Sequence, residues 1–124
     1  MAENKWKTKA LCLYRWIRLQ QNGVTLESLL MNRGFYKIAL YGFNEISKCV
    51  LYELANSQII VDCIIDMKGR KTPVNYKCIY PDEVDCLQVD AIIVTFSNPQ
   101  EFMDELEKNA NCEVVSFEEL IYEL

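Results

Sequence analysis

From residue 35 onward, short apolar runs rich in β-branched residues alternate with amphipathic stretches, and this rhythm leaves few folds open to the chain. Residues 91–96 are apolar on both sides of an extended backbone, so a strand there needs cover on both faces of its sheet. Strands separated by helices cannot be joined as simple hairpins. The pattern therefore predicts a parallel sheet with helices on both faces.

The rhythm predicts five strands, at residues 37–41, 59–66, 78–80, 91–96 and 112–117. The helices expected with them are residues 45–56, a short helix opened by Pro81, one begun by Asn98 and Pro99, and residues 118–124. The helix over residues 45–56 carries Ile46, Cys49, Val50 and Leu54 on one face, and the helix begun by Asn98 turns Phe102, Leu106 and Ala110 inward. Residues 67–77 read as a polar loop. Five strands in this rhythm favour an α/β, Rossmann-like, doubly wound parallel sheet of order 3-2-1-4-5. We expect residues 35–124 to form this domain as a single folding unit.

Residues 1–34 lack a β-rich run and form an N-terminal helical extension in this interpretation. An apolar stripe at helical spacing predicts an amphipathic helix over residues 3–21 that packs its stripe across the sheet. The stripe consists of Trp6, Ala10, Leu13 and Ile17, widened by Leu11 and Tyr14. The alternative is that this helix, which also carries Trp16, binds a protein partner or a second copy.

A second, short helix is expected after Asn22 and Gly23, which end the first. Thr25 is its N-cap, and Gly34 ends it as a left-handed cap. Its inward residues are Leu26, Leu29 and Leu30.

Charge and residue content exclude several function classes. The 124 residues carry a net charge of −5, which disfavours binding to a phosphate backbone. Histidine is absent, which removes histidine-dependent nucleophiles and the commonest zinc ligand. The six cysteines have no metal-site spacing, and four lie in apolar runs, so buried free thiols in a reducing compartment are expected. No run is long enough to span a membrane, and no signal peptide is evident, so we expect a cytoplasmic protein.

The turn after the first strand invites comparison with the dinucleotide-binding fingerprint Gly-x-Gly-x-x-Gly. Here the sequence from residue 42 is Gly-Phe-Asn-Glu-Ile-Ser. Gly42 matches the tight-turn glycine, whereas Asn44 and Ser47 replace the other two. Asp66 ends the second strand 24 residues after Gly42. An acid about 20 residues beyond the fingerprint can bind a ribose. The helix that starts near Asn44 offers its N-terminus to a phosphate.

These features predict a ligand site at the carboxyl ends of the strands, and the same residues also have a purely structural interpretation. The candidate residues are Gly42, Phe43, Asn44, Glu45, Ser47, Asp66, Thr95 and Ser97. In the structural interpretation, Gly42 serves only the turn and Ser97 with Asn98 caps a helix. Glu45 suits the helix dipole but repels an incoming phosphate. No catalytic or metal-binding residues are predicted.

The chain resembles a family of small Rossmann-like domains from bacterial surface-polysaccharide biosynthesis. The similar segments cover nearly its whole length: Trp16, residues 25–30, 37–42, Asp66, 89–95 and 118–124. It is also similar to the nucleotide-sugar-binding N-terminal domain of sugar acyltransferases and to the NAD- or CoA-binding domains that precede sugar dehydratases. The resemblance implies a nucleotide, nucleotide-sugar or dinucleotide ligand, such as NAD(P) or CoA.

Two functions are therefore expected. The first is a non-catalytic module that binds a nucleotide-type ligand and is accessory to glycan biosynthesis. The alternative is a degenerate Rossmann scaffold without a small-molecule ligand. In that case the N-terminal helix contacts a glycosyltransferase or forms a homodimer. In neither function does this chain catalyse a reaction by itself.

Overall fold

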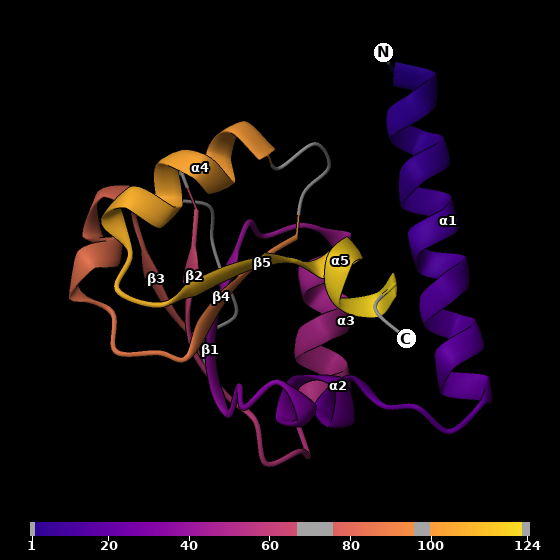
Figure 1. Ribbon diagram of the computed structural model, residues 1–124. Coiled ribbons are helices and arrows are strands. Elements are labelled where there is room, and N and C mark those ends of the chain that lie inside the picture. Colours follow the sequence, from indigo (N-terminus) through magenta and orange to yellow (C-terminus); the bar gives the residue numbers. More distant parts are fainter. Residues whose placement is uncertain (1, 67–75, 96–99, 123–124) are drawn as a thin grey trace.

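The computed structural model describes residues 2–66, 76–95 and 100–122, and its architecture is α/β (Figure 1). Its helices are α1 (Ala2–Gln21), α2 (Leu26–Asn32), α3 (Glu45–Leu54), α4 (Gln100–Asn109), α5 (Phe117–Tyr122) and the 3₁₀ helix η1 (Pro81–Cys86). Its strands are β1 (Lys37–Tyr41), β2 (Ile60–Ile65), β3 (Lys77–Ile79), β4 (Ala91–Val94) and β5 (Glu113–Ser116). The expected loop between β2 and β3 falls mostly outside the described residues.

The strands form one sheet of order β3-β2-β1-β4-β5, in which every pair is parallel. The predicted order is therefore confirmed. The central strand β1 aligns Leu40 with Ile64 of β2 on one side and with Ile93 of β4 on the other. Its position at the centre of the sheet, between β2 and β4, explains why its sequence is apolar at successive positions.

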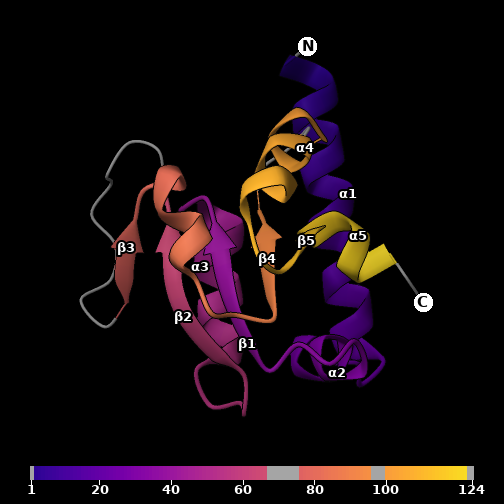
Figure 2. The ribbon, with the colours of Figure 1, turned by 60° about the vertical axis from the view of Figure 1, so that its left-hand side comes forward.

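Two apolar clusters lie on the two faces of the sheet, because successive residues of a strand point to opposite faces. Ile38 and Leu40 of β1 belong to the cluster that α1, α2, α3 and α5 cover. Ala39 and Tyr41 belong to the cluster under η1 and α4. Figures 1 and 2 show these helices on the two sides of the sheet. The prediction that helices cover both faces of the sheet is therefore confirmed.

Helix α3 buries the expected stripe with the exception of one residue. Ile46, Val50 and Leu54 are buried as predicted, but Cys49 is exposed. At 100° per residue, Cys49 lies on the far side of Ile46 from Val50 and Leu54. Leu51 completes the buried face instead.

Helix α2 follows its prediction closely. The Thr25 hydroxyl accepts a hydrogen bond from the Ser28 backbone N–H at 3.1 Å, which caps the helix. Leu26, Leu29 and Leu30 are buried. Gly34 has a φ of 79°, the left-handed conformation that its position after the helix requires. In α4, Leu106 is buried as expected, while the side chain of Phe102 lies outside the described part.

Helix α1 packs against the rest of the molecule mainly with the face opposite the predicted one. Its buried residues are Cys12, Trp16 and Leu19. Of the predicted stripe, Leu13 is partly buried against the core, whereas Trp6 and Ile17 are exposed. Both faces of this helix are apolar, so periodicity alone does not identify the face that is buried. The Trp16 ring meets Phe117 of α5 edge-to-face, with ring centroids 4.8 Å apart.

The Glu53 carboxylate of α3 fixes α1 and α2 to the body. It accepts hydrogen bonds from Trp16 Nε1 at 2.8 Å, from Gln20 Nε2 at 2.6 Å, and from the Leu26 backbone N–H at 2.6 Å. Three donors from two other elements therefore converge on one side chain.

The thiols are all free, but only some are buried as expected. Cys12 and Cys63 are buried, Cys112 is half-buried, and Cys49, Cys78 and Cys86 are exposed. Burial raises the pKa of both Cys12 and Cys63 to about 11. Cys78 lies in an edge strand with an exposed face, which explains why an apolar run did not bury it.

Candidate functional site

The sheet brings three of the predicted site residues to one rim. Gly42, Asp66 and Thr95 follow β1, β2 and β4, which are neighbouring strands. Gly42 has a φ of 98°, and its N–H donates to the Ile65 carbonyl at 2.8 Å. A side chain at this φ is strained, so the turn requires glycine. Ser97, the remaining residue expected on this rim, lies outside the described residues.

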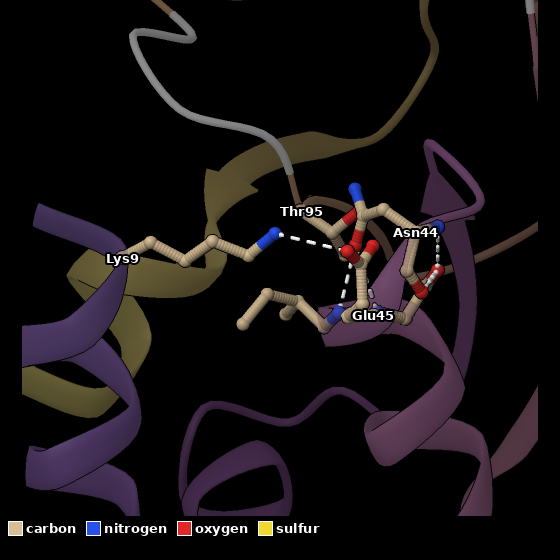
Figure 3. A network of polar contacts seen from close by, with 6 residues as sticks. Lys9, Asn44, Glu45 and Thr95 are labelled. Carbon is tan, nitrogen blue, oxygen red and sulfur yellow. Dashed lines mark hydrogen bonds and ion pairs between the residues drawn. The ribbon is translucent and has the colours of Figure 1, made fainter. Parts of the chain in front are cut away.

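Asn44 closes the start of α3 with a reciprocal cap (Figure 3). Its Oδ1 accepts hydrogen bonds from the backbone N–H groups of Ile46 at 2.9 Å and Ser47 at 3.1 Å. The Ser47 hydroxyl in turn accepts from the Asn44 N–H at 2.7 Å. The two residues that replace glycines of the fingerprint therefore form a capping box.

Thr95 ties this cap to the sheet. Its hydroxyl donates to the Tyr41 carbonyl at 2.8 Å and accepts from Asn44 Nδ2 at 3.2 Å. The side chain is buried, so its polar group is satisfied within the protein. Thr95 thus positions Asn44, and both of these hydrogen bonds lie within the protein.

Asp66 is also turned toward the backbone of the same turn. Its Oδ2 accepts a hydrogen bond from the Phe43 N–H at 3.3 Å, and the residue is only 6% exposed. Burial, with a smaller contribution from the Asp66 charge, raises the pKa of Tyr41 at the end of β1. The carboxylate expected to bind a ribose therefore lies mostly below the surface.

Glu45 and Lys9 form an ion pair in front of the helix start (Figure 3). The Lys9 Nζ lies 3.6 Å from Glu45 Oε1, and the glutamate side chain is 71% exposed. A hydrogen bond from the Glu45 backbone N–H and the charge of Lys9 lower the pKa of the Glu45 carboxyl. Sequence reasoning missed Lys9, because no local pattern links residues 36 positions apart in the chain.

Taken together, five N–H groups of this turn are bonded within the protein. Gly42 donates to a strand carbonyl, Phe43 to Asp66, Asn44 to Ser47, and Ile46 and Ser47 to Asn44. A phosphate at this helix start would have to displace the Asn44 side chain and approach the Glu45 carboxylate. The geometry is that of a closed turn. Among the described residues, no Asp, Glu or Cys cluster gathers as metal ligands.

The second candidate surface is the outward side of α1. Trp6, Ala10, Tyr14 and Ile17, here called the outer stripe, fall within a sector of about 80° on the helix. Trp6 is 64%, Tyr14 62% and Ile17 52% exposed. In Figure 1 this helix stands at the edge of the molecule. In the described ranges, neither α1 nor any other helix is long and apolar enough to cross a membrane.

Comparison with known proteins adds no relative to these observations: no protein-family model, curated protein or solved structure matches the chain.

Proposed function

We propose that this chain is a non-catalytic, Rossmann-like scaffold that acts through protein contact, with the outer stripe of α1 as its contact surface. The observation that carries the proposal is the exposure of three large apolar side chains along one line of a helix. Aromatic residues are favoured in the buried centres of protein interfaces, and contiguous apolar patches mark such sites. The internally bonded turn at Gly42 supports the same choice. The resemblance noted above implies a bacterial glycosyltransferase as the partner.

The test uses size-exclusion chromatography of extracts of the protein's own cells and compares the wild-type chain with a surface variant. The triple variant Trp6→Ser, Tyr14→Ser, Ile17→Ser removes the outer stripe without touching the buried face. We expect the wild-type chain to elute with a partner and this variant to elute as a free chain of 14.5 kDa. The matched control Tyr52→Ser, Ile60→Ser, Tyr80→Ser removes exposed apolar groups elsewhere and keeps the complex.

Surface variants are required because α1 cannot simply be deleted. Removing residues 1–22 would expose the core that Cys12, Trp16 and Leu19 cover, and it would leave Glu53 without two of its donors. A triple variant that remains in the complex would overturn the proposal, provided that circular dichroism shows it to be folded.

A second candidate, a site for a nucleotide-type ligand, is favoured by one observation. Lys9 brings a cation to the rim where Gly42, Asp66 and Thr95 gather. In this function, Asn44 swings away, α3 and Lys9 hold the phosphate, and Asp66 holds a ribose.

A thermal-shift panel with NAD, NADP, CoA, UDP-sugars and GDP-sugars separates the two functions. At 1 mM, a ligand with a dissociation constant of about 10 μM adds about 2.7 kcal/mol, which is several degrees in a domain of this size. Protein contact alone predicts no rise. A rise that Asp66→Ala abolishes would establish the ligand site instead.

A further inference from the structure

The charges beside the outer stripe are arranged on one side of it. Lys7 and Arg18 are eleven residues apart, so they lie within about 20° of each other around the helix and about 16 Å apart along it. Both are exposed. Lys9 instead pairs with Glu45, and Arg15 lies against the Ile121 carbonyl and the Tyr122 ring. Of the cations whose side chains the structure describes on α1, Lys7 and Arg18 therefore face outward.

Charge is also segregated over the whole chain. The sequence of α1 contains five Lys or Arg residues and one Glu, a contribution of +4. Since the chain carries −5, everything outside α1 carries −9. The surface that binds the outer stripe must therefore suit a basic helix mounted on an acidic body.

A second copy of α1 does not meet this requirement. An antiparallel pair that sets Trp6 against Ile17 of the other copy also sets Lys7 against Arg18 at both ends. Like charges beside an interface disfavour the pairing. Among the described side chains of α1, an anionic bilayer gains two outward cations, and it meets the acidic body as well, so it is also a poor match.

We propose that the outer stripe docks into an apolar groove of a partner protein, one lip of which carries carboxylates opposite Lys7 and Arg18. The stripe supplies anchors at steps of four, four and three residues, the spacing with which an amphipathic helix occupies a groove. The small Ala10 allows close approach between the larger anchors. The partner's carboxylates lie about 16 Å apart along the lip, matching the two cations. This inference rests on the proposed function and specifies the chemistry of the partner.

Photo-crosslinking of the full chain in its own cells tests this proposal. Tyr14→p-benzoylphenylalanine places the reactive group in the stripe, and Tyr52→p-benzoylphenylalanine on α3 is the control position. We expect one protein adduct from position 14 and none of that protein from position 52. Mass spectrometry should locate the crosslink in an apolar segment flanked by Asp or Glu.

Charge reversal then separates this inference from the proposed function. Lys7→Glu with Arg18→Glu should reduce the adduct at least tenfold. Lys77→Glu with Lys108→Glu, the same change in net charge on exposed residues outside α1, should leave it unchanged. A protein adduct that is insensitive to Lys7 and Arg18 overturns the acidic groove while the contact function stands. An adduct with a second copy of the chain also overturns the groove. Lipid adducts alone, or no adduct, overturn both.

Discussion

At the scale of single residues, Glu53 is a polar side chain that accepts hydrogen bonds from both N-terminal helices. Its carboxylate joins α3 to the Trp16 and Gln20 side chains of α1 and to the first N–H of α2. Hydrogen bonds to a charged group contribute more than neutral ones, and a buried donor left without an acceptor is costly. Removing this carboxylate should therefore loosen two helices at once.

We expect Glu53→Ala to lower the free energy of unfolding by about 2–4 kcal/mol. Glu53→Gln should cost less, because its amide keeps one acceptor oxygen. Urea denaturation followed by circular dichroism measures both changes. Glu107→Ala, on the exposed side of α4, is the control and should change stability by less than about 0.5 kcal/mol. Equal effects at both positions would contradict this account of Glu53.

The candidate turn shows what the sequence does and does not reveal about individual residues. Gly42, Asp66 and Thr95 were expected at one rim, and the strand order brings them there. The hydrogen bonds of Asn44 do not follow from the fingerprint, which has a glycine without a side chain at this position. The three-residue spacing of Asn44 to Ser47 is the signal that predicts a capping box. Lys9 leaves no such signal, since its contact depends on the packing of α1.

At the scale of elements, the strands were the most predictable and the orientation of α1 the least. A strand buried on both faces reveals itself by composition alone, as at β4, where all four residues are buried. Helix α1 is apolar on two sides, with Cys12, Trp16 and Leu19 on the buried one. Local periodicity cannot rank two apolar faces, because the choice depends on the surface offered by α3 and α5. The hydrogen bonds of Glu53 join residues far apart in the sequence, so local sequence patterns do not predict them either.

Helix α1 lies at the edge of the molecule and joins the rest through the turn at Asn22 and Gly23 (Figure 2). We expect it to undock before the sheet unfolds, since peripheral elements open at lower free energy than central strands. Buried thiols report both events, because Cys12 lies on the buried face of α1 and Cys63 lies in β2. With iodoacetamide at neutral pH, Cys12 should react at least about tenfold faster than Cys63.

The exposed Cys49 provides the unprotected reference in the same experiment. Quantifying alkylated peptides by mass spectrometry over a urea series gives all three rates. If Cys12 and Cys63 respond identically to urea, α1 is part of the same cooperative unit as the sheet. That result would count against independent undocking.

At the scale of the whole molecule, the two faces of the sheet are covered by different helices. The face under α1, α2, α3 and α5 holds the larger cluster and supports the outer stripe, whereas η1 and α4 cover the other. Each face buries one strongly shifted thiol, Cys12 on the first and Cys63 on the second. Global stability is therefore coupled to pH at the alkaline end through both halves of the core.

The sign of that coupling follows from the direction of the shifts. Burial is the main cause that raises the pKa of Cys63 from 9.0 to about 11, so the folded protein retains a proton that the unfolded chain releases. The stabilising contribution is complete below about pH 9 and is lost as the pH rises toward 11. For one thiol the loss amounts to about 2 kcal/mol by pH 11.

We expect the free energy of unfolding of Cys63→Ala to fall less steeply than that of the wild type between about pH 9 and 11, by about 2 kcal/mol over the interval. The substitution itself lowers stability by creating a cavity, but that cost is the same at every pH. Urea denaturation at a series of fixed pH values therefore separates the two effects, the cavity as an offset and the thiol as a difference in slope. Parallel curves would show that Cys63 ionises equally easily in both states. In that case the burial of β2 between β1 and β3 would not exclude water from the thiol, contrary to its position in the sheet.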